Sequence, residues 1–199
     1  MNELLRPPFL PVTTQAAEGL QRRRFTVAEI ESMVASGIIA EDERLELIGG
    51  EVVPLSPKGR RHEVLRSELA FMLSRQCPAH LKVATETPLN LAADCAPEPD
   101  IIVFPAPLRA PDVDGNSVLM VIEIADTSLA YDLTTKPAIY ASHNVREYWV
   151  INANTLETTT HSEPSGSAYR VAPTVDAEQL LLPRAAPELG VRLADLDLG

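Results

Sequence analysis

The feature that most constrains the fold is the run VLMVIEIAD at residues 118–126. It is short, rich in β-branched residues and almost wholly apolar, which is the pattern of a central strand buried on both faces of a sheet. Glu123 interrupts it. An ionised carboxylate there costs several kcal/mol unless it is paired, protonated, bound to a cation or placed at a strand end facing a cleft. The run alone leaves these four explanations open.

Length and composition indicate an ordinary globular protein. The chain has 199 residues, of which 45% are hydrophobic, and this suits a single domain. No window holds the ~18 uninterrupted apolar residues of a membrane span. The start, MNELLRPPFLPV, has prolines where a signal peptide needs a helical apolar core. We therefore expect a cytoplasmic protein with no membrane partner.

The balance of charge argues against a general nucleic-acid coat protein. The formal net charge is −11, whereas such proteins present a basic surface. A local exception is KGRRHEVLR at residues 58–66, which is either a set of solvated loop and helix charges or a segment that holds a nucleic-acid backbone. Lysine is rare, since Lys58, Lys82 and Lys136 are the only three.

Hydrophobic periodicity and turn signals divide the chain into helices and strands. A capping box at Thr26–Glu29 begins a helix, and Gly49-Gly50 between two alternating segments is a hairpin signal. In order, we expect a helix over 26–36, a hairpin over 44–55, a helix over 58–78, one or two strands over 81–92, strands over 100–104 and 118–126, a helix over 132–144, a strand over 146–152, and an outer hairpin of 155–163 and 168–172 with its turn at 163–167.

This order predicts an α/β (α+β) domain with a mixed central sheet flanked by helices and an outer β-hairpin. Two buried strands joined by a helix imply a parallel crossover. Residues 1–24 are dotted with proline and are expected to form a poorly ordered arm. Residues 25–199 then make a single domain, and its C-terminal extension from about residue 173 packs across the body.

Two acids on neighbouring buried strands suggest a metal site. Asp100 begins one strand and Glu123 lies within the other. Neighbouring strands lie roughly 5 Å apart, so carboxylates at matched heights could share one divalent cation. Mg²⁺ sites commonly use one or two carboxylates and keep waters for substrate phosphates.

The following helix brings a lysine toward these acids. Asp132, Lys136 and Tyr140 recur at i, i+4 and i+8, so they share one helix face, and this face should pack on the sheet. Lys136 could simply neutralise the acids. It could also orient an attacking water and stabilise charge at a phosphorus centre.

These motifs together resemble a known family. PEPD, then VIEIADTS, then YDLTTKPAIYASHNVREYWVIN are similar to restriction-endonuclease-like proteins that are much expanded in cyanobacteria and belong to the PD-(D/E)XK nuclease superfamily. FTVAEIESM, RLELIGGEVV and HEVLRSELAFML agree upstream, so the resemblance covers about residues 25–155. It implies a restriction-endonuclease-like fold that hydrolyses DNA with Mg²⁺ or Mn²⁺.

The resemblance assigns roles position by position. Asp100 and Glu123 match the two acids of the motif and would hold the metal, together with the backbone carbonyl of Ile124. Lys136 matches a catalytic lysine that this family places in the helix after the strand. Glu46 matches an acid of the first strand and would be a third metal or water ligand.

Two of the assigned residues also have ordinary structural explanations. His62 matches a histidine at the start of the second helix and would act on substrate or as a base, yet an exposed histidine at a helix start usually has no such role. Glu46 alternates with Leu45 and Leu47, as a solvent-facing residue would.

The sequence departs from the family pattern at four places. Ala125 stands where the superfamily motif has its lysine, and Gly49-Gly50 replaces the usual Asp-Gly in the hairpin. Asp126 replaces a serine and adds charge near the site. Pro137 follows the catalytic lysine, and proline fits only the first turn of a helix. We therefore expect the helix to begin near residues 134–135 or to bend there.

The function implied is that of a Mg²⁺-dependent endonuclease acting on DNA, with a homodimer possible. One alternative is a catalytically inactive member of the fold that binds nucleic acid or a protein. Another is a phosphodiesterase for a small nucleotide, which would need no broad basic surface. Fold resemblance does not by itself decide among them.

Overall fold

The structure is a computed structural model that describes residue 20, residues 22–55 and residues 57–199. Most of the predicted N-terminal arm lies outside these residues. Two arginines of the arm that the structure does describe form ion pairs with the rest of the protein. Arg22 contacts Glu51 at 2.8 Å, and Arg24 contacts Asp94 at 2.5 Å.

Helices and strands follow the expected order. The α-helices are α1 (Val27–Ala35), α2 (Arg60–Gln76), α3 (Leu129–Thr134) and α4 (Lys136–Ser142). The strands are β1 (Leu45–Ile48), β2 (Glu51–Pro54), β3 (Leu81–Thr85), β4 (Ile101–Pro105), β5 (Met120–Ala125), β6 (Glu147–Asn152), β7 (Thr158–Ser165), β8 (Ala168–Val171) and β9 (Thr174–Val175). Short 3-10 turns are η2 (Ala110–Asp112), η3 (Pro187–Leu189) and η4 (Leu193–Asp195).

The central sheet is mixed, as the sequence predicts. Its strand order is β3-β4-β5-β6-β7-β8, with β9 paired to β7. Only β5 and β6 among these neighbours run parallel, because α3 and α4 carry the chain back across the sheet between them. The predicted α+β class with a mixed sheet, flanking helices and an outer hairpin is therefore confirmed.

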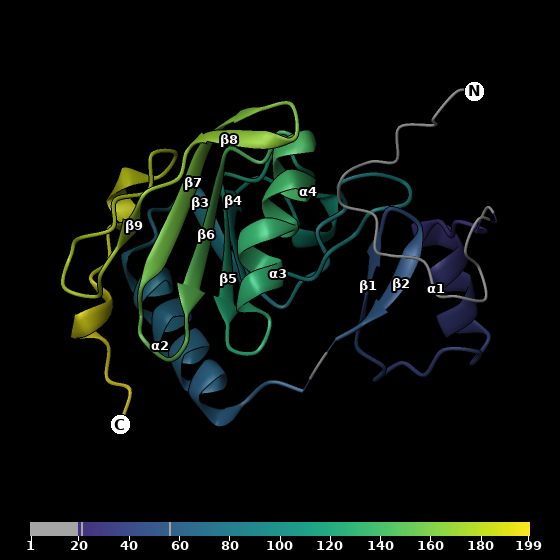
Figure 1. The fold of residues 1–199 in the computed structure, drawn as a ribbon, viewed down its shortest axis with the longest axis horizontal. Helices are drawn as coiled ribbons and strands as arrows, with labels where there is room; N and C mark the ends of the chain where they lie inside the picture. The colour runs from purple at the N-terminus through teal and green to yellow at the C-terminus, as the bar shows by residue number, and fades with distance from the viewer. Residues whose placement is uncertain (1–19, 21, 56) are drawn as a thin grey trace.

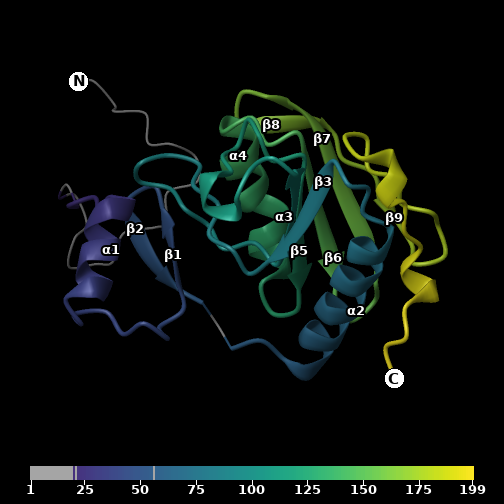
Figure 2. The ribbon, with the colours of Figure 1, turned by 180° about the vertical axis from the view of Figure 1, so that it is seen from behind.

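Helices cover both faces of this sheet, and each face has its own apolar core (Figures 1 and 2). On one face α2 presents Leu65, Leu69 and Leu73 at intervals of four to the alternate side chains of β4, β5 and β6. The C-terminal extension packs into the same core, through Leu181, Leu189, Val191 and Leu193. On the other face α4 contributes Tyr140.

A second, two-stranded sheet lies to one side of the central sheet, beside α1 (Figure 1). Its two-residue turn is Gly49-Gly50, and both glycines have positive φ, at 57° and 80°, as this hairpin turn requires. Leu47 of β1 exchanges backbone hydrogen bonds with Ala96. This pairing ties the hairpin to the segment that leads into Asp100.

The predicted helix over 132–144 is divided in two. α3 ends at Thr134 and α4 begins at Lys136. Pro137 is the cause, since it has no N–H to donate and its ring would clash with a carbonyl in the preceding turn. At the second position of α4 it is tolerated, so the expectation of a break near residues 134–135 is confirmed.

Two other expectations differ in extent. The segment 81–92 forms one strand, β3, and then a loop. The outer hairpin turns at Gly166 and Ser167, where Ser165 pairs with Ala168, and not across the whole of residues 163–167. Gly166 supplies the positive φ of 63° that so tight a turn needs.

Among the helices described, none combines the length and apolar character that crossing a bilayer requires.

Candidate active site

Strand register places the two motif acids together. Ile101 of β4 pairs with Ile122 of β5 in antiparallel register. Asp100 immediately precedes Ile101 and Glu123 immediately follows Ile122, so this register, extended by one residue, brings the two acids opposite each other, where Cβ atoms are about 5 Å apart. Both side chains line one cavity of about 310 Å³.

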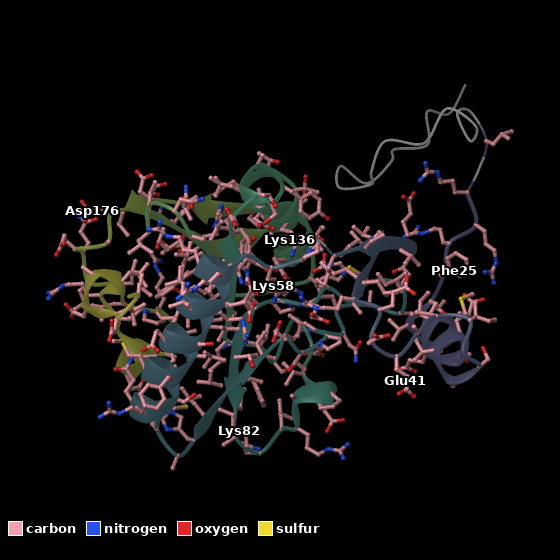
Figure 3. The ribbon with its side chains drawn as sticks, turned by 90° about the horizontal axis from the view of Figure 1, so that it is seen from below. Phe25, Glu41, Lys58, Lys82, Lys136 and Asp176 are labelled. Carbon is pink, nitrogen blue, oxygen red and sulfur yellow. The ribbon has the colours of Figure 1, made fainter. Side chains whose placement is uncertain are left out.

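All six residues assigned from the sequence line this cavity: Ile124, assigned for its backbone carbonyl, and five assigned for their side chains, which come from five segments of the chain. Those five are Glu46 of β1, His62 of α2, Asp100 before β4, Glu123 of β5 and Lys136 of α4. Figure 3 shows Lys58 and Lys136 in the middle of the molecule, and both lie on the cavity wall.

Both oxygens of the Asp100 carboxylate contact donor groups of the protein. Its Oδ1 accepts from Lys58 Nζ at 2.7 Å, and its Oδ2 accepts from the backbone N–H of Ile124 at 2.7 Å. His62 Nε2 lies 3.1 Å from the same Oδ2. Burial raises the pKa of Asp100, but the hydrogen bond and charge of His62 and the charge of Lys58 outweigh it and lower the pKa to about 2. Asp100 is therefore an anion at neutral pH.

Glu123 is held through one oxygen only, as far as the described residues show. Its Oε1 accepts from Lys136 Nζ at 2.8 Å and from the Tyr140 hydroxyl at 2.8 Å. Burial raises the pKa of Glu123 to about 8, and neighbouring acids add to the effect although the charge of Lys136 opposes it. Its Oε2 atom accepts no hydrogen bond from the described residues, and Glu123 lines the cavity.

Lys136 reaches the acids in spite of Pro137. Its ammonium also donates to Glu46 Oε1 at 3.1 Å and lies 3.7 Å from Asp132 Oδ1. Burial favours the neutral amine, but the charges of Glu123, Glu46 and Asp132 outweigh it and raise the pKa of Lys136 well above its ordinary value. Lys136 is therefore a permanent cation among three acids.

The reading of Glu46 as a solvent-facing residue was wrong. Only 1% of Glu46 is exposed, because β1 turns this face toward the cavity. Its Oε1 accepts from the backbone N–H of Glu98 at 2.9 Å as well as from Lys136. Two donors on one oxygen fix the side chain.

The expectation of an exposed His62 was also wrong. His62 is 6% exposed, and it lies three residues before Leu65, on the buried stripe of α2. Its Nδ1 has no hydrogen-bond partner among the described residues. The ring therefore closes the cavity wall behind Asp100.

The cavity has an excess of buried acid. Glu46, Asp100, Glu123 and Asp132 are each at most 5% exposed, and Lys136 and Lys58 are the lysines that contact them. Such an excess is costly unless a proton or a cation compensates it. Oxygen donors of this kind suit hard cations such as Mg²⁺.

The donor set fits a metal held by a small number of protein ligands. No group of three or more His, Cys, Asp or Glu side chains in the described part of the chain is arranged to hold an ion. Asp100, just before β4, and Glu123 of β5 line the same cavity, and Mg²⁺ commonly takes one or two carboxylates and completes its shell with water. Asp100 and Glu123 therefore fit Mg²⁺ or Mn²⁺.

Three residues that contact the site acids or Lys136 were not assigned a catalytic or metal-binding role from the sequence. Tyr140 and Asp132 were noted only as members of a packing stripe with Lys136, and Lys58 only as part of a basic run. Tyr140 hydrogen-bonds to Glu123, and Ser128 donates to Asp132 at 2.5 Å. The i, i+4, i+8 spacing of Asp132, Lys136 and Tyr140 was the available signal, because residues at this spacing share one helix face. On that face Tyr140 and Lys136 contact Glu123, and Asp132 lies beside Lys136.

The raised pKa of Glu123 predicts how stability depends on pH. Its value of about 8 lies above the ordinary 4.5, so the folded protein keeps a proton that the unfolded chain releases. Stability of the metal-free protein should therefore fall as pH rises from about 4.5 to about 8. Glu123→Gln should reduce this fall, as measured by urea unfolding in EDTA at both ends of the range. Equal falls in the two proteins would contradict the prediction.

Comparisons with known proteins agree with the fold. No curated protein matches the chain significantly. The structure is similar to the crystal structure of a putative nuclease belonging to DUF820 from Anabaena variabilis ATCC 29413, with a TM-score of 0.66 and 18% identity over 86% of this chain and 96% of that one. The Uma2 family, described as putative restriction endonuclease, matches residues 28–196. The chain therefore belongs to the Uma2 family.

Proposed function

We propose that this protein is a Mg²⁺-dependent endonuclease that hydrolyses DNA phosphodiester bonds. The observation that carries the proposal is the meeting of Asp100, Glu123 and Lys136, from three different elements, on the wall of one cavity. Membership of a family described as restriction endonucleases supports it.

Asp100 and Glu123 would hold the metal, with the backbone carbonyl of Ile124 beside them. Asp100 is suited to this because its pKa of about 2 keeps it charged. Glu123 is suited because it lines the cavity and its Oε2 has no donor among the described residues. When bound, the ion would polarise the phosphate and lower the pKa of a coordinated water.

Lys136 would orient the attacking water and stabilise charge at phosphorus. Its ammonium is placed by Glu123 and Glu46, and Tyr140 holds the oxygen of Glu123 that faces Lys136. A group held by several fixed donors and acceptors keeps its position during the reaction, which is what catalysis by orientation requires.

The start of α2 would contact the DNA backbone. Arg60 and Arg61 are exposed there, and the cap residue Gly59 lines the cavity and provides no side-chain cap. Uncapped backbone N–H groups and arginines at a helix start suit phosphate groups. This small basic region would bind DNA although the whole chain is acidic.

The direct test is cleavage of supercoiled and linear DNA with Mg²⁺ or Mn²⁺. Wild type should nick or linearise the DNA, whereas Asp100→Ala should not, because it removes a metal ligand. Asp112→Ala is a matched control, since Asp112 makes only an exposed ion pair with Arg109. Absence of metal-dependent cleavage by the wild type, or wild-type activity in Asp100→Ala, would contradict the proposal.

Metal binding should also be visible without any substrate. A ligand that binds only the folded state stabilises it by mass action, so Mn²⁺ or Mg²⁺ should raise the melting temperature of the wild type. Asp100→Asn should reduce that gain, and Asp112→Asn should keep it. An undiminished gain in Asp100→Asn would place the metal elsewhere.

One observation favours a second candidate, a phosphodiesterase for a small nucleotide. The cavity of about 310 Å³ is within the range of roughly 300–1,000 Å³ that small-molecule sites occupy, and the net charge of −11 opposes long polyanions. A dinucleotide substrate added to the same assay separates the two. Turnover of the dinucleotide without cleavage of long DNA would favour this candidate.

A further inference from the structure

Three basic side chains from separate segments converge on the carboxylate of Glu86, just after β3. Lys58 Nζ lies 2.8 Å from Oε1 and Arg44 Nη2 lies 3.3 Å from the same oxygen. Arg66 Nη1, from α2, lies 3.2 Å from Oε2. One carboxylate therefore occupies the centre of a three-cation cluster, which we call the Glu86 cluster.

The backbone holds Glu86 in an unusual conformation. Its φ is 48°, in the left-handed region that residues other than glycine, asparagine and aspartate seldom adopt. Its N–H donates to the carbonyl of Asp100 at 3.2 Å. The position of Glu86 is thus set by its backbone, next to the residue that is proposed to hold the metal.

The cluster adjoins the cavity and is open to solvent. Lys58 bridges it to the site, because the same ammonium contacts Glu86 and Asp100. Arg44 and Lys58 both line the cavity. The side chain of Glu86 is 34% exposed, so an external anion can reach the position that it fills.

The three cations are also neutralised without Glu86. Arg44 forms a hydrogen-bonded ion pair with Glu98, Arg66 contacts Glu63 at 2.6 Å, and Lys58 contacts Asp100. Partly exposed ion pairs such as those of Glu86 are weak in water. Replacement of this one carboxylate by another anion would therefore leave the remaining pairs intact.

We propose that Arg44, Lys58 and Arg66 form a binding site for one phosphate group of a nucleic-acid backbone, and that the carboxylate of Glu86 fills this site in the free protein. Two guanidinium groups and an ammonium offer several N–H donors, and the arginine fork matches the oxygens of a phosphate as well as those of a carboxylate. The inference rests on the proposed function, since it supplies a backbone contact beside the same cavity.

A site that is already filled by Glu86 has a lower apparent affinity for a phosphate group of DNA. If Glu86 fills the site nine-tenths of the time, the site is competent only one-tenth of the time, and the apparent affinity falls about tenfold. Removing the carboxylate should restore that factor. It should also add about one phosphate contact, which steepens the slope of log K against log salt by about 0.9.

The test is binding of a short fluorescein-labelled DNA duplex, followed by anisotropy in EDTA so that neither metal binding nor cleavage takes part. Glu86→Asn removes the charge and keeps a residue that accepts positive φ. It should bind about tenfold more tightly than the wild type, with the steeper salt dependence. Adding Lys58→Met to this variant should remove most of the gain.

A matched control is available within the chain. Glu163 also has positive φ, at 61°, and makes an exposed ion pair with Arg184 at 2.5 Å. Glu163→Asn makes the same change in net charge on the same kind of backbone, so it isolates the effect of position. A gain in Glu86→Asn no larger than that in Glu163→Asn, or a loss of binding, would overturn the inference.

Folding of the variants is checked by thermal unfolding, and Glu86→Gly serves as a second variant because glycine accepts the same backbone conformation. The inference and the proposed function can fail separately. DNA cleavage by the wild type with no gain in Glu86→Asn would overturn the phosphate site alone. A gain in binding with no metal-dependent cleavage by the wild type would overturn the nuclease proposal and support the site.

Discussion

Replacing Lys136 with methionine should lower the free energy of unfolding by about 3–5 kcal/mol, which is the usual cost of removing one partner of a buried charge network. Lys136 is 5% exposed, and its ammonium is the cation shared by Glu123 and Glu46, with Asp132 close by. Methionine keeps the volume of the side chain and removes the charge. Urea unfolding at neutral pH in EDTA measures the effect.

The loss should be partly recovered by a second substitution. Glu46→Gln removes an acid that pairs with Lys136 at 3.1 Å, so the double variant should be more stable than Lys136→Met alone. Lys82→Met is the control, because the one side-chain hydrogen bond of Lys82 to the described residues is an exposed one to the carbonyl of Leu108. Its effect should stay within about 0.5 kcal/mol. A loss in Lys136→Met below about 1 kcal/mol would show that Lys136 does not compensate these acids.

Replacing Lys136 with arginine should abolish DNA cleavage while the protein still folds. The positive charge survives, so the acids remain compensated, but a planar guanidinium cannot occupy the compact donor position of an ammonium. A water displaced by about 1 Å from its line of attack can lose ~100-fold in rate. We therefore expect at least that loss in single-turnover cleavage of supercoiled DNA.

Two further measurements separate a loss of water orientation in Lys136→Arg from a loss of metal binding or a general effect of a lysine-to-arginine change. The affinity for Mn²⁺ should stay close to that of the wild type, since the proposed ligands Asp100 and Glu123 are unchanged. Lys82→Arg should cleave DNA normally. Full activity in Lys136→Arg would contradict the water-orienting role and leave neutralisation of Glu123 and Glu46 as the function of Lys136.

Much of the fold follows from local patterns in the sequence. The apolar run at residues 118–126 became β5, buried on both faces, and the stripe at intervals of four became the inner face of α2. Both are consequences of periodicity, because burial of an apolar face is the main gain that these segments can make. The break before α4 follows equally from the chemistry of Pro137.

The candidate site was predictable where strand neighbours decide it. Asp100 begins one buried strand and Glu123 lies within the next. Consecutive strands tend to pair, so the only further information needed to predict that the two acids lie close together was the register of the two strands. Lys136 was expected beside them because of the helix face it shares with Tyr140. The structure places Asp100, Glu123 and Lys136 on the wall of one cavity.

The burial of Glu46 and His62 was decided by the tertiary structure alone. Alternation along residues 45–47 says which residues share a face, but not whether another part of the chain covers that face. The segment before β4 pairs with β1 through Leu47 and Ala96, and this pairing buries Glu46 in the cavity.

The Glu86 cluster is the clearest case of what the sequence could not determine. Arg44, Lys58, Arg66 and Glu86 lie up to 42 residues apart in the chain, and nothing in their local patterns indicates a common position. The sequence by itself determined the strands, the helices and the acids that the strands carry, because these depend on periodicity and local backbone chemistry. Tertiary packing decided which distant charges share one space, because that depends on how the hairpin, α2 and the end of β3 meet.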